Sequence, residues 1–200
     1  MAFTFFFRDT HILDLVAKHV VPDVTGYSRV RVWDAGCAMG PEPYSLAIYL
    51  AENMGRFAFR NINILATDID ESGGFGKIIE EGIYSDEELK RIPRPLFDKY
   101  FEAADRPGHF RINESIRSSI KFQYHDLLSL QPPGNTFHMI MCKNVLLHFS
   151  PKQRVEVIRM FHSVLTPGGW FCTEQTQKMP EENEHLFARV GSDGQLFRRV

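Results

Sequence analysis

The order of strand-like and glycine-containing segments near the start of the chain is the feature that most restricts its fold. A strand-like segment at 30–33 ends at Asp34, a loop with two glycines spans 36–40, a helical pattern covers 43–53, and a second strand-like segment spans 62–66. Two strands that are joined through a helix pair in parallel, with a right-handed connection. The pattern therefore predicts an α/β fold, with a parallel sheet and helices on both faces.

The rest of the chain continues this alternation. A helix is expected at 11–20, and a capping box that starts at Ser85 predicts a short helix. The continuous apolar run at 137–142 is typical of a buried parallel strand. Ser150 is followed by proline and, three residues on, by glutamine, which indicates the start of a helix. A strand at 170–172 follows that helix.

Two further predictions concern the least regular parts of the sequence. Strand-like runs at 110–112 and 116–124 predict a small β-insertion at about 106–124. The last residues, 196–200, are expected to form a final edge strand. The whole chain, residues 1–200 with the β-insertion included, is expected to form one domain.

Composition narrows the class of protein. Lys and Arg number 23 and Asp and Glu 25, which gives a formal net charge of -2 and disfavours a dedicated nucleic-acid binder. With 44% hydrophobic residues and no apolar run of membrane-spanning length, the chain is expected to be globular and not inserted in a membrane. Three cysteines without paired spacing indicate a reducing compartment and no disulfide framework, so we expect a cytoplasmic protein.

Polar side chains follow several predicted strands at the point where each strand ends. In open α/β sheets, ligands bind at the carboxyl ends of the strands, near the point where the strand order reverses. The residues at such ends are 34–40, Asp68, 126–127 and 143–144. Asp68 is placed to accept from ribose hydroxyls. Asp70 competes for that role.

The loop at 36–40 restricts the ligand. The dinucleotide fingerprint G-x-G-x-x-G is absent, because Ala38 occupies the position of its middle glycine. This disfavours a nicotinamide or flavin cofactor. It is compatible with S-adenosylmethionine (SAM), which has no phosphate. Gly36 is a candidate contact, because a glycine lets the backbone approach a ligand closely.

Six motifs, in order, resemble those of one family, the CheR-type chemotaxis receptor methyltransferases. They are TFFFRD (4–9), GCAMGPEPYS (36–45), LATDID (65–70), GIY (82–84), CKNVLLHF (142–149) and LTPGG (165–169). The resemblance runs from Thr4 to Gly169. It implies a Rossmann-like class I SAM-dependent methyltransferase fold with a small β-subdomain inserted in the sheet.

The resemblance also implies an activity. The family transfers the methyl group of SAM to glutamate side chains on the cytoplasmic helices of chemoreceptors and forms methyl esters. The partner is then a chemoreceptor, with no nucleic acid and no metal. Carried over by motif, and with Gly36 added, the cofactor-binding residues are Thr4, Arg8, Gly36, Glu42, Asp68, Asp126, Leu127, Lys143 and Asn144. The residues expected at the reaction centre are Arg8 and His148.

Individual roles follow from the chemistry of the side chains. A guanidinium at Arg8 is suited to hold the substrate carboxylate or the SAM carboxylate in a two-pronged hydrogen bond; the alternative is an arginine on a terminal arm. Glu42 is suited to pair with the SAM ammonium; the alternative is a favourable charge at a helix N-terminus. Tyr44 and Ser45 are expected to pack rather than to bind a ligand.

Several departures from the family pattern leave other functions open. The family's N-terminal helical domain does not precede the TFFFRD motif here, and His148 stands where the family usually has tyrosine. One alternative is a SAM-binding module that no longer transfers methyl groups and acts as a sensor or scaffold. Another is a class I methyltransferase that acts on a different acceptor, such as a small acid. These departures bear on receptor recognition more than on SAM binding.

Overall fold

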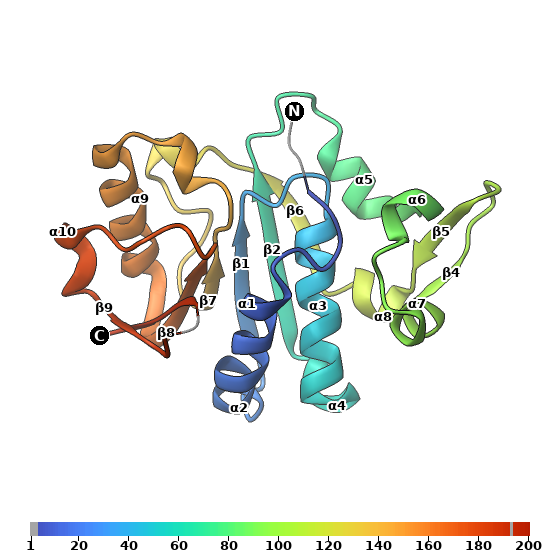
Figure 1. The fold of residues 1–200 in the computed structure, drawn as a ribbon, viewed down its shortest axis with the longest axis horizontal. Coiled ribbons are helices and arrows are strands. Elements are labelled where there is room, and N and C mark those ends of the chain that lie inside the picture. Colours follow the sequence, from blue (N-terminus) through green and yellow to red (C-terminus); the bar gives the residue numbers. More distant parts are fainter. Residues whose placement is uncertain (1–3, 193) are drawn as a thin grey trace.

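The computed structural model describes residues 4–192 and 194–200 and is built around a seven-stranded sheet (Figure 1). In spatial order, its strands are β6 (Ile120–Tyr124), β2 (Ile62–Asp68), β1 (Val30–Ala35), β7 (Phe137–Met141), β8 (Leu165–Thr173), β10 (Gln195–Arg199) and β9 (Phe187–Arg189). The first five run parallel, and β10 is antiparallel to both of its neighbours. The α/β fold expected from the sequence is therefore present.

Each face of the sheet is covered by its own helices and has its own apolar core. The helices over one face include α1 (Thr10–Leu15), the π-helical turn η1 (Val16–Val20), α2 (Val21–Val24), α3 (Pro41–Met54) and α4 (Arg56–Phe59), and α9 (Pro151–Val164) packs on the other face. Strand β1 shows why: Val30 and Val32 belong to the first core, while Trp33 and Ala35 belong to the second. Successive side chains of a strand point to opposite faces. The last helix is α10 (Glu181–Glu184).

A second, three-stranded sheet lies at one end of the molecule, on the right of Figure 1. Its order is β3 (Ile83–Ser85), β5 (His109–Ile112) and β4 (Phe101–Ala103), with antiparallel pairing. The helices of this region are α5 (Phe75–Glu81), α6 (Asp86–Leu89), α7 (Arg94–Tyr100) and α8 (Glu114–Arg117). We call these three strands the small sheet.

The small sheet differs from the β-insertion that the sequence predicts. The assignment of 116–124 to that insertion is wrong, because β6 pairs in parallel with β2 and forms an edge of the main sheet. Before it, the Asn113 side chain accepts a hydrogen bond from the backbone N–H of Ile116 and caps the single helical turn of α8. A short apolar run does not reveal which sheet it joins.

The final strand is also placed differently. Strand β10 is not at the edge, because it lies between β8 and β9, and β9 forms that edge. β9 has only three residues, which is too short for the alternation of polar and apolar side chains to signal a strand. Within the described residues, no helix is long and apolar enough to cross a membrane.

The strand order fixes where a ligand is expected. From β1 the chain runs outward to β2 and β6, and then returns to the opposite side of β1 as β7. The order therefore reverses between β1 and β7. This brings the loop after β1 next to the loop after β7, and such a crevice is where open α/β sheets bind ligands.

Candidate functional site

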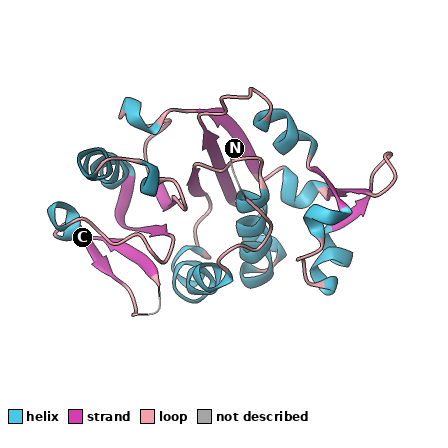
Figure 2. Cartoon of the chain, turned by 45° about the horizontal axis from the view of Figure 1, so that its top comes forward, coloured by secondary structure: helices cyan, strands magenta, loops and turns pink. Residues whose placement is uncertain are grey.

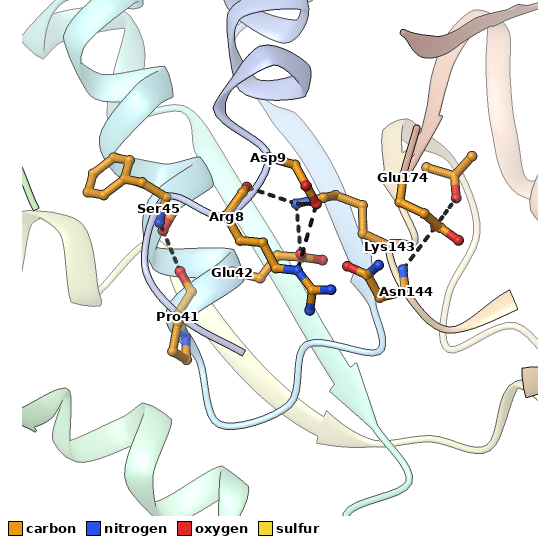
Figure 3. A network of polar contacts seen from close by, with 10 residues as sticks. Arg8, Asp9, Pro41, Glu42, Ser45, Lys143, Asn144 and Glu174 are labelled. Atoms are coloured by element: carbon orange, nitrogen blue, oxygen red, sulfur yellow. Dashed lines mark hydrogen bonds and ion pairs between the residues drawn. The ribbon is translucent and has the colours of Figure 1, made fainter. Parts of the chain in front are cut away.

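Lys143, directly after β7, is the buried centre of the crevice (Figure 3). Its Nζ lies 3.1 Å from Glu42 Oε2 and 3.4 Å from Asp9 Oδ2, and it donates to the carbonyl oxygen of Arg8 at 3.2 Å. The Lys143 ammonium is thus surrounded by two carboxylates and one carbonyl oxygen, although Asp9 Oδ2 forms an ion pair with it and no hydrogen bond. Burial lowers the pKa of Lys143, but the charges of Glu42 and Asp9 outweigh burial and raise it. Lys143 therefore stays charged and links the start of the chain to α3 and β7.

Residues 4–9, which we call the N-terminal arm, are fixed by the core. Phe6 is fully buried, with its ring centroid 4.9 Å from that of Tyr84. The backbone N–H of Phe7 donates to Ser45 Oγ at 2.8 Å, and Ser45 Oγ donates to the carbonyl of Pro41 at 2.6 Å. Ser45 thus has the packing role expected for it. Figure 2 shows the small sheet, to which Tyr84 belongs, to the right of the central strands.

Arg8 is held at the crevice because its neighbours in the chain are fixed. Phe6 and Phe7 are buried before it, and Asp9 after it pairs with Lys143. The Arg8 side chain is 27% exposed, with Nε 3.9 Å from Asp9 Oδ2 and the guanidinium carbon 5.8 Å from the ring centroid of Phe5. Phe7 and Asp9 have backbone φ angles of 57° and 55°. This is the left-handed conformation, which residues other than glycine rarely adopt. The arm therefore keeps an unfavourable backbone shape that places Arg8 beside Lys143.

Four carboxyl groups of the crevice have buried oxygens that accept no hydrogen bond from the described residues: Asp9 (Oδ2), Asp34 (both oxygens), Glu42 (Oε1) and Glu174 (Oε1). Asp34 is 0% exposed and neither of its carboxylate oxygens accepts a hydrogen bond from the described residues; the same holds for Oε1 of Glu42. Burial, and then the charge of Glu42, raise the pKa of Asp34 well above its usual range, although Lys143 acts in the opposite direction. Buried polar atoms normally have partners, so these oxygens point to a cationic or hydrogen-bond-donating ligand.

Asp68 and Asp70, which the sequence leaves as rivals, have different surroundings. Asp68 Oδ2 accepts from the N–H of Ala38 at 2.9 Å, and its Oδ1 accepts from the N–H of Asp70 at 3.1 Å. Each oxygen keeps a further acceptor site. Asp70 instead accepts from Ser72 Oγ and from the backbone N–H groups of Gly74 and Phe75, at the start of α5. The structure thus gives Asp70 a local role and leaves Asp68 beside the loop.

The loop at 36–40 is packed from two sides. Gly36 has φ of 96°, and a Cβ there would lie 2.2 Å from Cγ2 of Val145, so only glycine fits. The hydroxyl of Tyr84 donates to the carbonyl of Met39 at 2.8 Å. Gly36 therefore lets the loops after β1 and β7 approach each other, and Tyr84 connects the small sheet to the same loop.

Two further loops lie at the edge of the main sheet that carries the crevice. The N–H of Asn144 donates at 2.9 Å to Oε2 of Glu174, which is 3% exposed. Asp126 Oδ1 accepts from the N–H of Leu128 at 2.8 Å and caps the single turn η2 (Leu127–Ser129), in which Leu127 is buried. The N–H of His125 donates to the carbonyl of Asp68 at 2.9 Å, which brings this last loop beside Asp68.

Thr4 and His148, the first and last residues of the predicted set, have no hydrogen bond or ion pair with Lys143 among the described residues. Thr4 is half-buried at the start of the described chain. His148 is exposed at the end of the short turn η3 (Leu146–His148). The structure brings Arg8, Glu42 and Lys143 together, and it places Asp68 and Asp126 on adjacent loops. Among the described residues, no hydrogen bond or ion pair joins the His148 side chain to them.

Comparison with known proteins decides the family. The family model of the CheR methyltransferase SAM-binding domain matches residues 2–195. The chain belongs to this family. Chemotaxis protein methyltransferase 1 of Pseudomonas aeruginosa is 30% identical to it, over 98% of this chain and 73% of the relative. Chemotaxis protein methyltransferase 2 of Vibrio cholerae is 31% identical, over 88% of this chain and 62% of the relative.

A solved structure agrees on the fold of this CheR-family chain. The magnesium protoporphyrin IX methyltransferase from Synechocystis PCC 6803, with bound SAM, superimposes with a TM-score of 0.52 at 18% identity. The match covers 95% of this chain and 79% of the other. The fold is thus the class I SAM methyltransferase fold, and SAM is the cofactor of the family. The donorless Oε1 of Glu42 fits its ammonium.

Sequence reasoning missed part of this CheR-family site. Asp9 and Glu174 were not expected to contribute, and Asp34 was considered only as the first residue of the loop at 34–40. Asp34 follows the strand-like segment at 30–33, and Glu174 follows the strand predicted at 170–172. The rule that ligands bind at strand ends covers Asp34, and the same rule could have included Glu174. Asp9 is the last residue of the TFFFRD motif, but the motif does not indicate that its side chain pairs with Lys143.

Proposed function

We propose that this chain transfers the methyl group of SAM to glutamate side chains on the cytoplasmic helices of a chemoreceptor and forms methyl esters in the cytoplasm. The family and the names of the relatives support the reaction class. The observation that carries the proposal is the set of buried carboxylate oxygens without donors at the crevice, beside the arm that holds Arg8. This arrangement combines an acceptor for a cationic cofactor with a cation for an anionic substrate.

The methyl transfer requires alignment of the reacting groups and does not require a general base. SAM supplies a methyl group that is activated by its bond to a positively charged sulfur. A glutamate carboxylate has a pKa of about 4.3, so it is ionised at neutral pH and needs no proton removed before it attacks. The protein has to orient that carboxylate and exclude water. The partly accessible guanidinium of Arg8 is suited to this, since it can hold a carboxylate with two parallel hydrogen bonds.

Other residues have roles in holding the cofactor. Oε1 of Glu42 is assigned to the ammonium, and Asp68 to the ribose hydroxyls. The loops at 126–127 and 143–144, Gly36 and Thr4 complete the pocket. His148, exposed near the start of α9, is assigned to the acceptor side, where its imidazole replaces the tyrosine that the family usually has.

Replacing Glu42 tests the assignment of the cofactor site. The variant Glu42→Gln keeps the shape of the side chain but removes the charge that faces the ammonium. We expect binding of SAM and of S-adenosylhomocysteine to weaken roughly 10- to 100-fold, as for loss of a charged hydrogen bond, measured by isothermal titration calorimetry. Glu102→Gln, on the exposed surface of β4, is the control and should bind as the wild type does. Equal binding by all three proteins would contradict the assignment.

Transfer of a labelled methyl group tests the reaction itself. With labelled SAM and chemoreceptor membranes, we expect label on the receptor that is released by base, because methyl esters are labile to base. Binding of SAM without transfer to any acceptor would instead support the sensor or scaffold. Transfer to a small acid alone would support a different acceptor.

A further inference from the structure

We propose that a cationic groove beside α9 binds an acidic, glutamate-rich helical segment of the protein that is methylated. This inference rests on the proposed function and names a surface that serves it. The groove has a volume of about 460 Å³ and lies between α9 and the chain around residues 177–182. We call it the α9 groove.

Charge is the first observation. Four cations line the α9 groove, Lys152, Arg154, Arg159 and Lys178, against one carboxylate, Glu182. The chain as a whole has a net charge of -2, so this concentration of positive charge runs against the average. Among the described residues, none of the four cations takes part in an ion pair. Their charge is thus available to a partner.

Position is the second observation. Both walls of the α9 groove begin at the edge of the sheet that carries the crevice. One wall starts at Pro151, seven residues after Asn144, and Arg154 Nε donates to the carbonyl of Phe149 at 3.0 Å. The other wall includes Gln177, whose N–H donates to the carbonyl of Glu174 at 3.1 Å. Since Asn144 donates to Glu174, the two walls meet beside the reaction site.

The chemistry of the substrate selects the occupant. A segment that offers a glutamate for methylation and repeats glutamates three or four residues apart presents a negative stripe along one helix face. A cluster of cations next to the active site attracts such a stripe and holds it in register. A nucleic acid would be held by a longer basic track over many phosphates, and four cations on a chain of negative net charge do not supply one.

The test uses two variants that are matched in charge and residue type. In the groove variant, Lys152→Glu, Arg159→Glu and Lys178→Glu are combined. In the control variant, the exposed residues Lys18, Arg29 and Lys121 are changed to glutamate. The probe is a fluorescein-labelled helical peptide with glutamates four residues apart, and its binding to the full chain is measured by fluorescence polarisation at low salt.

We expect the groove variant to raise the Kd of the peptide at least about tenfold and the control variant to change it less than about twofold. A peptide with glutamine at the same positions should bind poorly to all proteins. Both variants should bind S-adenosylhomocysteine as the wild type does. An equal loss in the two variants would overturn the proposal, as would displacement of the peptide by duplex DNA that depends on the groove cations.

The outcomes also separate this proposal from the proposed function. Peptide binding is read without turnover. If the wild type binds the peptide through the groove but transfers no methyl group to a receptor, the proposed function fails and the surface stands. If the wild type methylates a receptor and the groove variant does so with an unchanged KM, the surface fails and the function stands.

Discussion

The ion cluster around Lys143 differs from an ordinary surface pair in how its charges are solvated. Lys143 is 3% exposed and pairs with two carboxylates, whereas Lys99 pairs with Glu52 at the surface, where the Lys99 side chain is 57% exposed. Removing one partner of a buried cluster leaves uncompensated charges in a medium that solvates them poorly. The same change at the surface returns both groups to water.

We therefore expect Lys143→Met to lower the free energy of unfolding by roughly 3 kcal/mol, because Glu42 and Asp9 lose the cation between them and the carbonyl of Arg8 loses its donor. The control Lys99→Met should lower it by less than about 1 kcal/mol. Urea denaturation followed by circular dichroism measures both. Similar losses in the two variants would show that Lys143 is solvated in a way that its burial does not suggest.

Asp34 makes stability depend on pH. Burial and the charge of Glu42 raise its pKa in the folded protein, against an opposing effect of Lys143, and Asp68 adds to the rise. A carboxyl whose folded pKa is raised above its unfolded value stabilises the fold at low pH, and this contribution is lost as the pH rises through the folded pKa. Asparagine at this position does not titrate.

We expect Asp34→Asn to raise the melting temperature of the ligand-free protein at pH 8 more than at pH 5. Differential scanning calorimetry across that range measures the effect, with the exposed Asp105→Asn as the control. If Asp34→Asn instead changed the melting temperature more at pH 5 than at pH 8, the pKa of Asp34 would be lowered on folding.

At the scale of elements, the loop at 36–40 depends on a residue of the small sheet. Burial, the largest cause, raises the pKa of Tyr84, so its hydroxyl stays protonated and donates to the carbonyl of Met39. Tyr84→Phe should lower the free energy of unfolding by about 1 kcal/mol and weaken SAM binding severalfold, measured by urea denaturation and calorimetry. Tyr27→Phe, at an exposed ring, is the control. Undiminished SAM binding in Tyr84→Phe would mean that the loop keeps its shape without this bond.

The long elements of the fold were predictable and the short ones were not. The first strand, the glycine loop and α3 have strong signals, because apolar runs alternate with a capped helical pattern. Even so, α3 begins at Pro41 rather than at 43, since proline is well suited to a first turn. Strands β3, β4 and β9 have three residues each, and no periodicity can be read over such a length.

The site was predictable as a set of strand ends but not as a network. Strand-end positions and the family resemblance named Arg8, Glu42, Asp68 and Lys143, and the structure places these residues at the crevice or beside it. The sequence cannot show that Lys143 pairs with both Glu42 and Asp9, since this depends on the left-handed backbone of the arm. Lys143 was expected to contact the cofactor, and the structure gives it protein partners.

At the scale of the whole molecule, the reaction crevice lies between two surfaces of different kind. The small sheet is at one end and α9 is toward the other end, on the left of Figure 1, with the central strands between them. The core connects the small sheet to the N-terminal arm, because Phe6 packs against both Tyr84 and Phe101, with its ring centroid 5.9 Å from that of Phe101. A change at the small sheet can thus reach Arg8 through packed rings.

The buried Phe6 has a thermodynamic consequence for ligand binding. Because the Phe6 ring is part of the folded core, the arm is expected to lose its conformational entropy during folding and not when a cofactor arrives. Association then orders few additional residues and removes little apolar surface from water. The heat-capacity change on binding should consequently be small, of the size given by the buried ligand alone, rather than the large negative value of a segment that folds as it binds.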